Sequence, residues 1–478
     1  MKPVNINSLI EYSAVRQKHW DEIAGLNTSE PFFSSEYHRR LREVYSLLIS
    51  PNQDVLEIGC GRGDLLAAVA PRRGVGVDFS QVYISQARVS HPELTFIQAD
   101  AHEILLDARF DVIILSDLIN DIWDVQTVLE KISPLCKPDA RLILNFHSRV
   151  YQPVLSLAGR LGLAKRLLPQ NWLTPDDTEN LLTLSGFEVI RRQREILFTL
   201  PIPILRDLFN KFLVKLWPFN PLAWTNVFIA RRQPVPNTEK PSVSVIIPAR
   251  NESGNIEAAF QRLPRMGSRT EIIFVEGHSK DDTYATIERA IANHPEWQTR
   301  LFSQTGKGKA DAVRIGFEKA TGDVLMILDA DLTVRPEDLP RFYEALVNGK
   351  GDFINGVRLV YPMQDQAMRF LNLLGNKFFS LAFSWLLGQS IKDTLCGTKV
   401  LCKNHYDRIA ANRAYFGEFD PFGDYDLIFG AAKQNLKIID LPIRYQDRTY
   451  GATNIDRWRH GLLLFKMVAV AAARLKFI

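Results

Sequence analysis

The sequence predicts an α/β protein with two doubly wound α/β domains, and three observations lead to that prediction. Short apolar strands alternate with helical stretches in each half of the chain. Two of these strands, residues 55–58 and 324–328, run directly into glycine-rich or acidic residues, and open α/β sheets bind ligands at that end of a strand. Residues 233–241 are rich in proline, which resists both helix and central strand. We therefore interpret this segment as a linker between the halves. We therefore predict domains over residues 1–232 and 242–478.

Composition narrows the classes of protein. The 478 residues are 46% hydrophobic, which allows sizeable cores, and a net charge of +4 is too small to indicate a nucleic-acid partner. The four cysteines form no CxxC pair, which favours a reducing compartment. No apolar signal core follows the first residues, and no uncharged apolar run reaches the roughly 18 residues of a spanning helix. We expect a cytoplasmic protein that lies at the inner face of a membrane without crossing it.

The first half begins with a helical pattern from residue 11 to about residue 48. A helix is expected over residues 173–186, where Pro175, Asp176 and Asp177 suit the first turn. Residues 201–219 are apolar and interrupted by prolines, which fits a lid or a docking surface. The predicted strands are residues 55–58, 75–77, 94–97, 112–115, 142–146, 187–190 and 225–230.

The segment from Glu57 to Gly63 is the first candidate site. It ends one predicted strand and opens a helix, and Gly59, Gly61 and Gly63 allow the backbone to approach a ligand closely. Glu57 suits an amine-bearing ligand better than a pyrophosphate. Acids stand at the next two strand ends, where they can bind ribose hydroxyls and an adenine amine. These acids are Asp78 and Asp100.

This pattern resembles class I S-adenosylmethionine-dependent methyltransferases over about residues 37–232. The resemblance implies a Rossmann-like fold with S-adenosylmethionine as cofactor. It places the methionine part against residues 57–63, the ribose on Asp78, and the adenine near Asp100 and Ala101. It also places Ser116 and Asp117 beside the sulfonium.

No motif identifies the methyl acceptor. His147 lies just past the fifth predicted strand. It is either a general base for a hydroxyl acceptor or a polar residue at a strand end. The sequence leaves both interpretations open.

The second half repeats the alternation, and an acidic pair follows its fourth strand. Asp329 and Asp331 would repel each other if both faced one pocket, unless a divalent cation with oxygen ligands lay between them. Such a cation, Mg²⁺ or Mn²⁺, also holds a diphosphate. The predicted strands are residues 243–247, 271–275, 299–303, 324–328 and 352–355.

Residues 243–454 resemble family 2 glycosyltransferases with the GT-A fold. The resemblance implies a nucleotide-diphosphate sugar donor and makes Asp329 and Asp331 the metal-binding acids. The family often has a second acid where Gly277 stands, and this departure leaves the base and the sugar open. The other matched positions around the donor are Pro248, Asn251, Glu252, Glu276 and Lys307.

Two later segments, residues 392–399 and 444–454, resemble motifs of dolichol- and polyprenyl-phosphate sugar transferases. The resemblance implies a polyprenyl phosphate acceptor, whose phosphate Arg448 would position through its planar guanidinium. The usual lysine near the end of the second motif is Asn454 here. Asp424 and Asp426 occupy positions where relatives carry acids. One of them would be the base for a sugar hydroxyl, or both simply favour a helix start.

Two apolar stretches with aromatic residues and cations, residues 368–389 and 457–478, suit a lipid interface. The same pattern fits core helices, and the resemblance favours membrane contact. Together these observations predict a bifunctional, inverting glycosyltransferase and methyltransferase of cell-envelope glycan chemistry. Two alternatives stay open: a methyltransferase-like domain that only binds or scaffolds, and a glycosyltransferase that acts on a saccharide hydroxyl.

Overall fold

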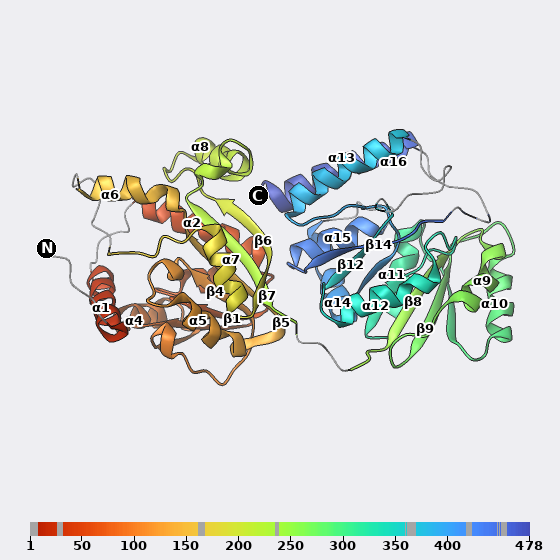
Figure 1. Cartoon of the computed structure of the whole chain (residues 1–478), viewed down its shortest axis with the longest axis horizontal. Coiled ribbons are helices and arrows are strands. Elements are labelled where there is room, and N and C mark those ends of the chain that lie inside the picture. The colour runs from red at the N-terminus through yellow and green to blue at the C-terminus, as the bar shows by residue number, and fades with distance from the viewer. Residues whose placement is uncertain are drawn as a thin grey trace. The chain divides into compact units, whose positions relative to one another are not determined.

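The computed structural model describes residues 8–25, 32–160, 168–234, 239–358, 360, 370–416, 423–446, 448, 450 and 457–478. Side chains in residues 32–33, 154, 158–160, 370–374, 424 and 457–460 are outside that description. The chain divides into two compact units, essentially Met1–Gln233 and Pro234–Lys476 (Figure 1). Each unit is built on a sheet of seven strands.

The first sheet has the strand order β3-β2-β1-β4-β5-β7-β6. Strands β1 to β5 pair in parallel, whereas β7 lies antiparallel between β5 and β6. The predicted alternation of strands and helices is present, but the sheet is mixed rather than wholly parallel. Its strands are β1 (Asp54–Ile58), β2 (Arg73–Asp78), β3 (Thr95–Gln98), β4 (Phe110–Ser116), β5 (Cys136–His147), β6 (Phe187–Glu195) and β7 (Thr225–Arg232).

Hydrophobic cores lie on both faces of this sheet, because successive strand residues point to opposite sides. In β4, Ile113 and Leu115 belong to one core, and Val112 and Ile114 belong to the other. The helices that contribute residues to these cores are α2 (Phe32–Leu48), α3 (Asp64–Ala68), α4 (Gln81–Ser90), α5 (Val125–Ile132) and α7 (Pro175–Leu184). The unit also contains α1 (Leu9–Gly25), α6 (Gln152–Arg160) and α8 (Pro203–Asp207). Thr174 and Asp177 form a reciprocal capping box at the start of α7, as its first-turn residues predict.

The second sheet has the order β10-β9-β8-β11-β13-β12-β14. Only β13 runs antiparallel to its neighbours, β11 and β12. The strands are β8 (Val243–Ala249), β9 (Thr270–Glu276), β10 (Gln298–Ser303), β11 (Val324–Ile327), β12 (Phe353–Val357), β13 (Lys399–Cys402) and β14 (Ile438–Pro442). The α/β prediction is therefore confirmed for both halves, with one antiparallel strand in each sheet.

Helices also cover both faces of the second sheet. Phe317 of α11 and Phe383 of α13 pack on one face, whereas Phe260 of α9 and Phe342 of α12 pack on the other. The helices are α9 (Ile256–Arg262), α10 (Thr283–Asn293), α11 (Lys309–Lys319), α12 (Leu339–Val347), α13 (Phe370–Leu387), α14 (Lys403–Ala411), α15 (Asp424–Lys433) and α16 (Arg457–Ala471). Throughout the described part of the chain, no helix has both the length and the hydropathy needed to cross a membrane.

Candidate active sites

The glycine-rich loop of the first unit turns sharply between β1 and α3. Gly59, Gly61 and Gly63 all have positive φ, at 74°, 50° and 78°, a backbone region that side chains disfavour. The Gly61 N–H donates to Asp78 Oδ2 at 2.9 Å, so the loop is tied to the end of the neighbouring strand. The predicted residues of the loop and of the second strand end therefore lie together.

Glu57 is buried at the base of this loop. Its Oε2 atom has no hydrogen-bond partner among the described residues. Burial, together with the nearby charge of Asp78, raises the pKa of Glu57 well above its usual range. Burial also raises the pKa of Asp78, although the N–H groups of Ser80 and Gly61 donate to it. The backbone of Leu66 hydrogen-bonds this carboxyl, so Oε2 is the oxygen whose hydrogen bond an amine-bearing ligand would supply.

Asp100, at the third strand end, has a different environment. Its Oδ1 accepts from the backbone N–H and Nδ1 of His102, and its Oδ2 accepts from Ser13 Oγ at 2.8 Å. Burial opposes ionisation, but these donors outweigh it and lower the pKa of Asp100 to about 2. The carboxylate is thus a ready acceptor for an amine, with Ser13 as the partner that a ligand would replace.

Helix α1 closes one side of the site, and no motif in the sequence marks it. It contributes to a cavity of about 570 Å³ that also includes the predicted residues Glu57, Asp78, Asp100 and Asp117. Trp20 Nε1 donates to Asp121 Oδ2 at 2.6 Å, and Gln17 donates to the Phe79 carbonyl at 3.1 Å. The α1 residues that line the cavity are Tyr12, Ser13, Arg16, Trp20 and Ile23.

A polar cluster lies where β4 and β5 end. Asp117 Oδ1 accepts from Tyr37 Oη at 2.9 Å and from Asn145 Nδ2 at 2.6 Å, and His147 Nε2 lies 3.5 Å away. Asp117 itself has φ 53°, an uncommon backbone conformation for a residue with a side chain. Ser116 also lines the cavity. The structure therefore joins His147 to the predicted pocket through a carboxylate.

In the second unit, Asp329 and Asp331 follow β11 and each carboxylate has a cationic partner. Lys309 Nζ lies 2.6 Å from Asp329 Oδ1, and Arg448 Nη2 lies 2.7 Å from Asp331 Oδ2. The N–H and hydroxyl of Thr333 also donate to Asp331 Oδ1, which fixes its orientation. Lys307, which the sequence predicted beside the donor, is exposed, whereas Lys309, two residues later, contacts the acid.

The two later motifs both reach this acidic pair. A Cβ atom on Gly397 would lie 2.0 Å from Asp329 Oδ2, so only glycine leaves the carboxylate its place. Arg448 bridges Asp331 and Glu252, whose Oε1 lies 3.2 Å from Nη1. Arg448 thus neutralises two acids in this structure, and contact with an acceptor phosphate would require these ion pairs to be exchanged or shared. Asn454 lies outside the described residues.

The predicted nucleoside side is built around β8 and β9. Asn251 Oδ1 accepts from the Lys280 N–H at 2.7 Å, and Glu276 Oε1 accepts from the Ser279 N–H at 2.5 Å. The ends of β8 and β9 are adjacent, since Pro248 lies opposite Val275 and Ala249 lies opposite Glu276 in the register. The buried Gln304, which the sequence did not single out, fills the space beside Gly277. A Cβ on that glycine would lie 2.9 Å from Gln304 Oε1.

The two candidate bases of α15 differ. Asp426 is buried, and its Oδ2 lies 2.7 Å from Arg413 Nε and 3.2 Å from Arg314 Nη2. Two arginines thus already pair with Asp426, and its role as a base for a sugar hydroxyl stays a prediction. The side chain of Asp424 lies outside the described residues. Gly423 packs against Ala310, so the start of α15 lies beside the start of α11, which carries Lys309.

The acidic pair could hold a divalent cation as two carboxylate ligands, with a substrate diphosphate among the remaining ligands. Within the described ranges, no cluster of three or more histidine, cysteine, aspartate or glutamate side chains is arranged to hold a metal ion. Magnesium commonly uses one or two carboxylates and completes its shell with water and substrate phosphates. Asp329 and Asp331 fit that donor set, with a diphosphate as the remaining ligand.

Comparison with known proteins matches each unit to a domain family. Residues 49–171 match a methyltransferase domain, and residues 244–415 match Glycosyl transferase family 2. The protein carries a methyltransferase domain and a family 2 glycosyltransferase domain. The resemblances predicted for the two halves are thereby confirmed, as is the prediction of an enzyme.

Relatives of the second domain include prenyl-phosphate sugar transferases. A dolichol-phosphate mannosyltransferase of Pyrococcus furiosus is 30% identical over 218 residues, which is 45% of this chain and 59% of the relative. An undecaprenyl-phosphate 4-deoxy-4-formamido-L-arabinose transferase of Aeromonas hydrophila is 32% identical over 117 residues, which is 24% of this chain and 36% of the relative. The chain thus spans less than two thirds of the length of each.

Among solved structures, the first domain is similar to magnesium protoporphyrin IX methyltransferase from Synechocystis, solved with bound SAH. That structure is 18% identical, with a TM-score of 0.33. The similarity covers 47% of this chain and 98% of the other.

Proposed function

We propose that the second domain transfers a sugar from a nucleotide-diphosphate sugar to a polyprenyl phosphate. The observation that carries the proposal is the convergence of both prenyl-transferase-like segments on the acidic pair, through Gly397 at Asp329 and Arg448 at Asp331. The Pyrococcus furiosus and Aeromonas hydrophila relatives, named for dolichol and undecaprenyl phosphate, support this class of acceptor.

The chemistry of a phosphate acceptor is consistent with the ion pairs that Asp426 forms. A phosphate oxygen is already anionic near neutral pH, so its in-line attack on the sugar, with inversion, requires no strong base. A sugar hydroxyl would require one, and Asp426 is held by Arg314 and Arg413. The ion pairs of Asp426 therefore support the phosphate acceptor, and Asp424 remains the candidate base for a saccharide hydroxyl.

The residues around the acidic pair have separate tasks in the proposed reaction. A Mg²⁺ or Mn²⁺ ion held by Asp329 and Asp331 would offset the negative charge of the departing diphosphate. Lys309 and Arg448, now paired with these acids, are released to contact donor and acceptor phosphates when the donor binds. Asn251, Glu252, Glu276 and Pro248 would then surround the nucleoside.

Membrane contact of the second domain would come from α13 and α16. Their exposed apolar side chains include Phe378, Leu381 and Trp385 of α13 and Leu462 and Phe465 of α16. Such surfaces suit a lipid interface, where a polyprenyl phosphate resides.

The first domain would transfer a methyl group from S-adenosylmethionine to a hydroxyl of a small molecule or saccharide. Glu57 Oε2, Asp78 and Asp100 supply acceptors for the amine, the ribose and the adenine. His147 beside Asp117 supplies a base held by a carboxylate, and Asp117 stabilises the imidazolium that forms. Alignment of the hydroxyl oxygen, methyl carbon and sulfur supplies the rest.

One experiment tests the sugar transfer. The full chain is incubated with undecaprenyl phosphate, a panel of UDP- and GDP-sugars, and Mg²⁺ or Mn²⁺ or a chelator, and nucleotide diphosphate release and the glycolipid product are measured. We expect metal-dependent release, which Asp331→Asn abolishes. Asp282→Asn, at an acid 65% exposed in the same domain, is the matched control and retains activity. Transfer by Asp331→Asn at the wild-type rate would exclude the proposed role of the pair.

A further inference from the structure

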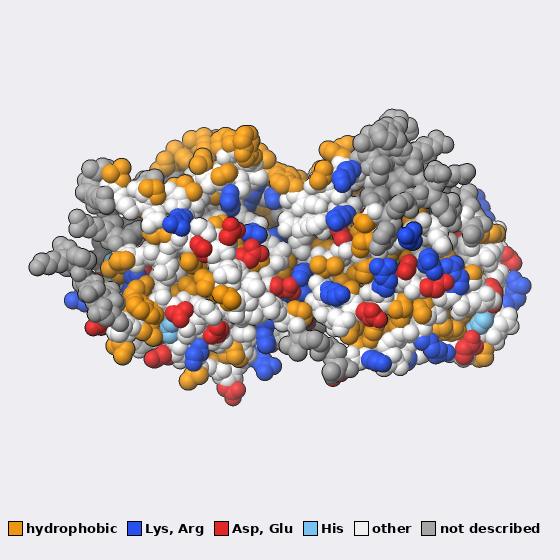
Figure 2. All heavy atoms as spheres, viewed as in Figure 1, with side chains coloured by type: hydrophobic (Ala, Val, Ile, Leu, Met, Phe, Trp, Pro, Cys, Tyr) orange, Lys and Arg blue, Asp and Glu red, His pale blue; other side chains and the backbone are white. Residues whose placement is uncertain are grey.

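Residues 201–222 of the first domain form a surface, here called the apolar cap, that the proposed chemistry does not use. It contains α8, a π-helix over Leu208–Phe212 and two short 3₁₀ turns, inserted between β6 and β7. Nine large apolar side chains in the cap have more than a third of their surface exposed, including Ile204 at 83% and Trp217 at 85%. They form the apolar area over α8 in Figure 2.

The polarity of the cap is inverted relative to a water-exposed helix. Two of its polar side chains, Asn210 and Lys215, point toward the protein. Asn210 is 2% exposed and bonds the backbone of Leu197 and Phe198, at distances from 2.6 to 2.9 Å. Lys215 is buried and forms an ion pair with Glu195, and burial lowers the pKa of Lys215.

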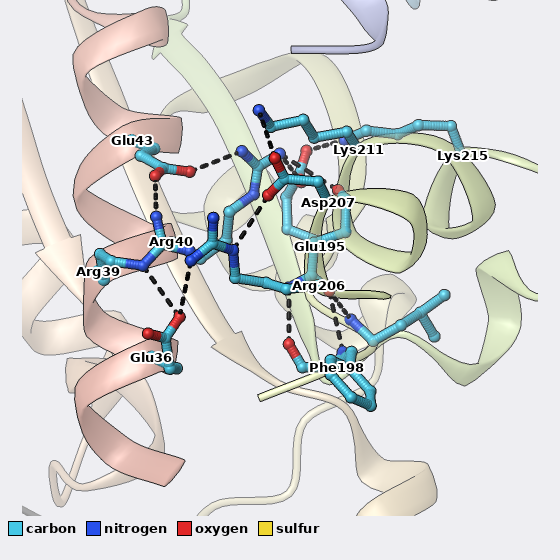
Figure 3. Close-up of polar contacts among 12 residues, drawn as sticks. Glu36, Arg39, Arg40, Glu43, Glu195, Phe198, Arg206, Asp207, Lys211 and Lys215 are labelled. Atoms are coloured by element: carbon cyan, nitrogen blue, oxygen red, sulfur yellow. Dashed lines mark hydrogen bonds and ion pairs between the residues drawn. The ribbon is translucent and has the colours of Figure 1, made fainter. Parts of the chain in front are cut away.

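Further charges hold the cap to α2 (Figure 3). Arg40 of α2 lies 3.4 Å from Glu195 and donates to the Asn210 carbonyl at 3.2 Å. Arg206 of α8 lies 3.7 Å from Glu36 of α2 and 3.0 Å from Asp207. The cap is therefore fixed by charges beneath it while it presents hydrocarbon outward, an arrangement that lowers free energy only against apolar surroundings.

The exposed side chains protrude, which distinguishes a lipid surface from a protein groove as the partner. Side chains more than four-fifths exposed enter a bilayer interface without a complementary pocket, and tryptophan and phenylalanine suit that interface. The three basic residues of the cap are already paired with acids, so the attraction to the bilayer comes from the protruding apolar side chains. We propose that the apolar cap is a second membrane-docking surface, through which the methyltransferase domain inserts into a bilayer.

The position of the cap has a consequence for the methyl acceptor, which rests on the proposed methyl transfer. Its last turn contacts the aromatic groups beside His147, since Tyr151 Oη donates to the Leu222 carbonyl at 2.6 Å. The Tyr151 ring lies 4.2 Å from the Trp224 ring, which in turn lies 6.4 Å from His147. Docking through the cap would bring this side of the site to the lipid, so we infer that the acceptor is itself carried on a lipid.

Depth in the bilayer is the direct test. The full chain carries Ile204→Cys labelled with an environment-sensitive fluorophore, in a Cys402→Ser background, because the other native thiols are buried. Vesicles contain phosphatidylethanolamine and phosphatidylglycerol, with and without a nitroxide-labelled lipid. We expect a blue shift and quenching at Ile204→Cys. The matched control, Val89→Cys in α4 at 83% exposure, shows neither.

Two outcomes would overturn the docking. One is an unchanged spectrum at Ile204→Cys on vesicles that bind the protein, which would assign binding to the second domain alone. The other is the same blue shift without lipid as protein concentration rises, with a dimer in sedimentation, which would assign the cap to a second copy of the chain.

Flotation gives a second measure. Ile204→Ser with Trp217→Ser should lower the ratio of vesicle-bound to free protein at least about tenfold, whereas Val89→Ser with Leu105→Ser should not change it. An unchanged ratio in the cap variant would contradict the proposal.

The acceptor is tested separately, with radiolabelled methyl from S-adenosylmethionine and a membrane extract. Label in the lipid phase supports a lipid-borne acceptor, and label only in the aqueous phase overturns that part while leaving the docking intact.

Discussion

Replacing Glu57 by glutamine tests whether the buried carboxyl is reserved for a cationic ligand group. The substitution keeps the shape of the side chain, removes its capacity to carry charge and replaces one acceptor oxygen by an NH2 donor. In the free protein, Glu57 Oε2 has no partner among the described residues, and burial raises its pKa well above the usual range. The raised pKa favours the neutral carboxyl in the free protein, and a bound ligand amine would favour the charged form.

The expected effect on binding follows from the strength of that contact. A hydrogen bond to a charged group contributes about 1.5–3 kcal/mol, so Glu57→Gln should weaken binding of S-adenosylhomocysteine by roughly 10- to 150-fold. That ligand has the same amine, ribose and adenine and undergoes no reaction. Isothermal titration calorimetry gives the dissociation constant directly.

The raised pKa adds a signature in pH. Below its pKa the free carboxyl holds a proton, which must leave when the ammonium binds. Affinity should therefore rise with pH up to the pKa of Glu57, and titrations in buffers of different ionisation enthalpy should reveal proton release. Stability has the opposite dependence, because folding favours the protonated carboxyl and its contribution is lost as pH rises through the raised pKa. Glu57→Gln should thus gain stability relative to wild type as pH increases.

Glu195→Gln is the matched control. Glu195 is also buried, but Lys215 and Arg40 already pair with it. Its substitution should destabilise the domain by up to about 3 kcal/mol and leave ligand affinity unchanged. Wild-type affinity in Glu57→Gln, or affinity that does not vary with pH, would refute the assignment of Glu57.

Three further predictions concern single contacts. Gly397→Ala should reduce sugar transfer at least about tenfold without unfolding, because its Cβ would take the place of the Asp329 carboxylate; circular dichroism and the transfer assay check both parts. Asp426→Asn should lower stability by about 3 kcal/mol in urea unfolding yet retain transfer, and loss of transfer in a folded variant would restore its role as a base. Hydrogen bonds from Arg72, with Lys137 nearby, lower the pKa of Asp54 to about 2, so its stabilisation is full above pH 3.8 and is lost as pH falls to about 2. Asp54→Asn should therefore cost up to about 2 kcal/mol near neutral pH, and unequal urea stabilities at pH 2 would contradict this.

The strands and the residues at their ends could be predicted because both depend on local sequence. Apolar runs specify the strands, and acids stand at their ends. Asp78 and Asp100 lie at neighbouring strand ends of the first sheet, and Asp329 follows a strand of the second sheet. The position of β7 could not be predicted in this way. Its sequence specifies a strand, whereas its antiparallel place between β5 and β6 depends on packing with residues about 80 and 40 positions earlier.

Partners distant in sequence explain the other differences. Asp426 has the local pattern of a helix start, but Arg314, 112 residues earlier, decides its environment. Arg448 reaches Asp331 across 117 residues, and Ser13 reaches Asp100 across 87. Helix α1 has no glycine or acidic motif, so its part in the first site had no local signal. The sequence shows that Gly277 departs from the family pattern. It gives no indication that Gln304, 27 residues later, lies beside this glycine.

The insertion of β7 also affects the order in which the first domain is completed during synthesis. Strand β5 has one edge without a partner until residues 225–232 have left the ribosome, because β7 is the strand that pairs with it. A nascent chain with β1 to β6 already translated therefore presents an open sheet edge. Ribosomes that pause between residues 195 and 232 should leave this domain dependent on chaperones, and a nascent chain released there should aggregate.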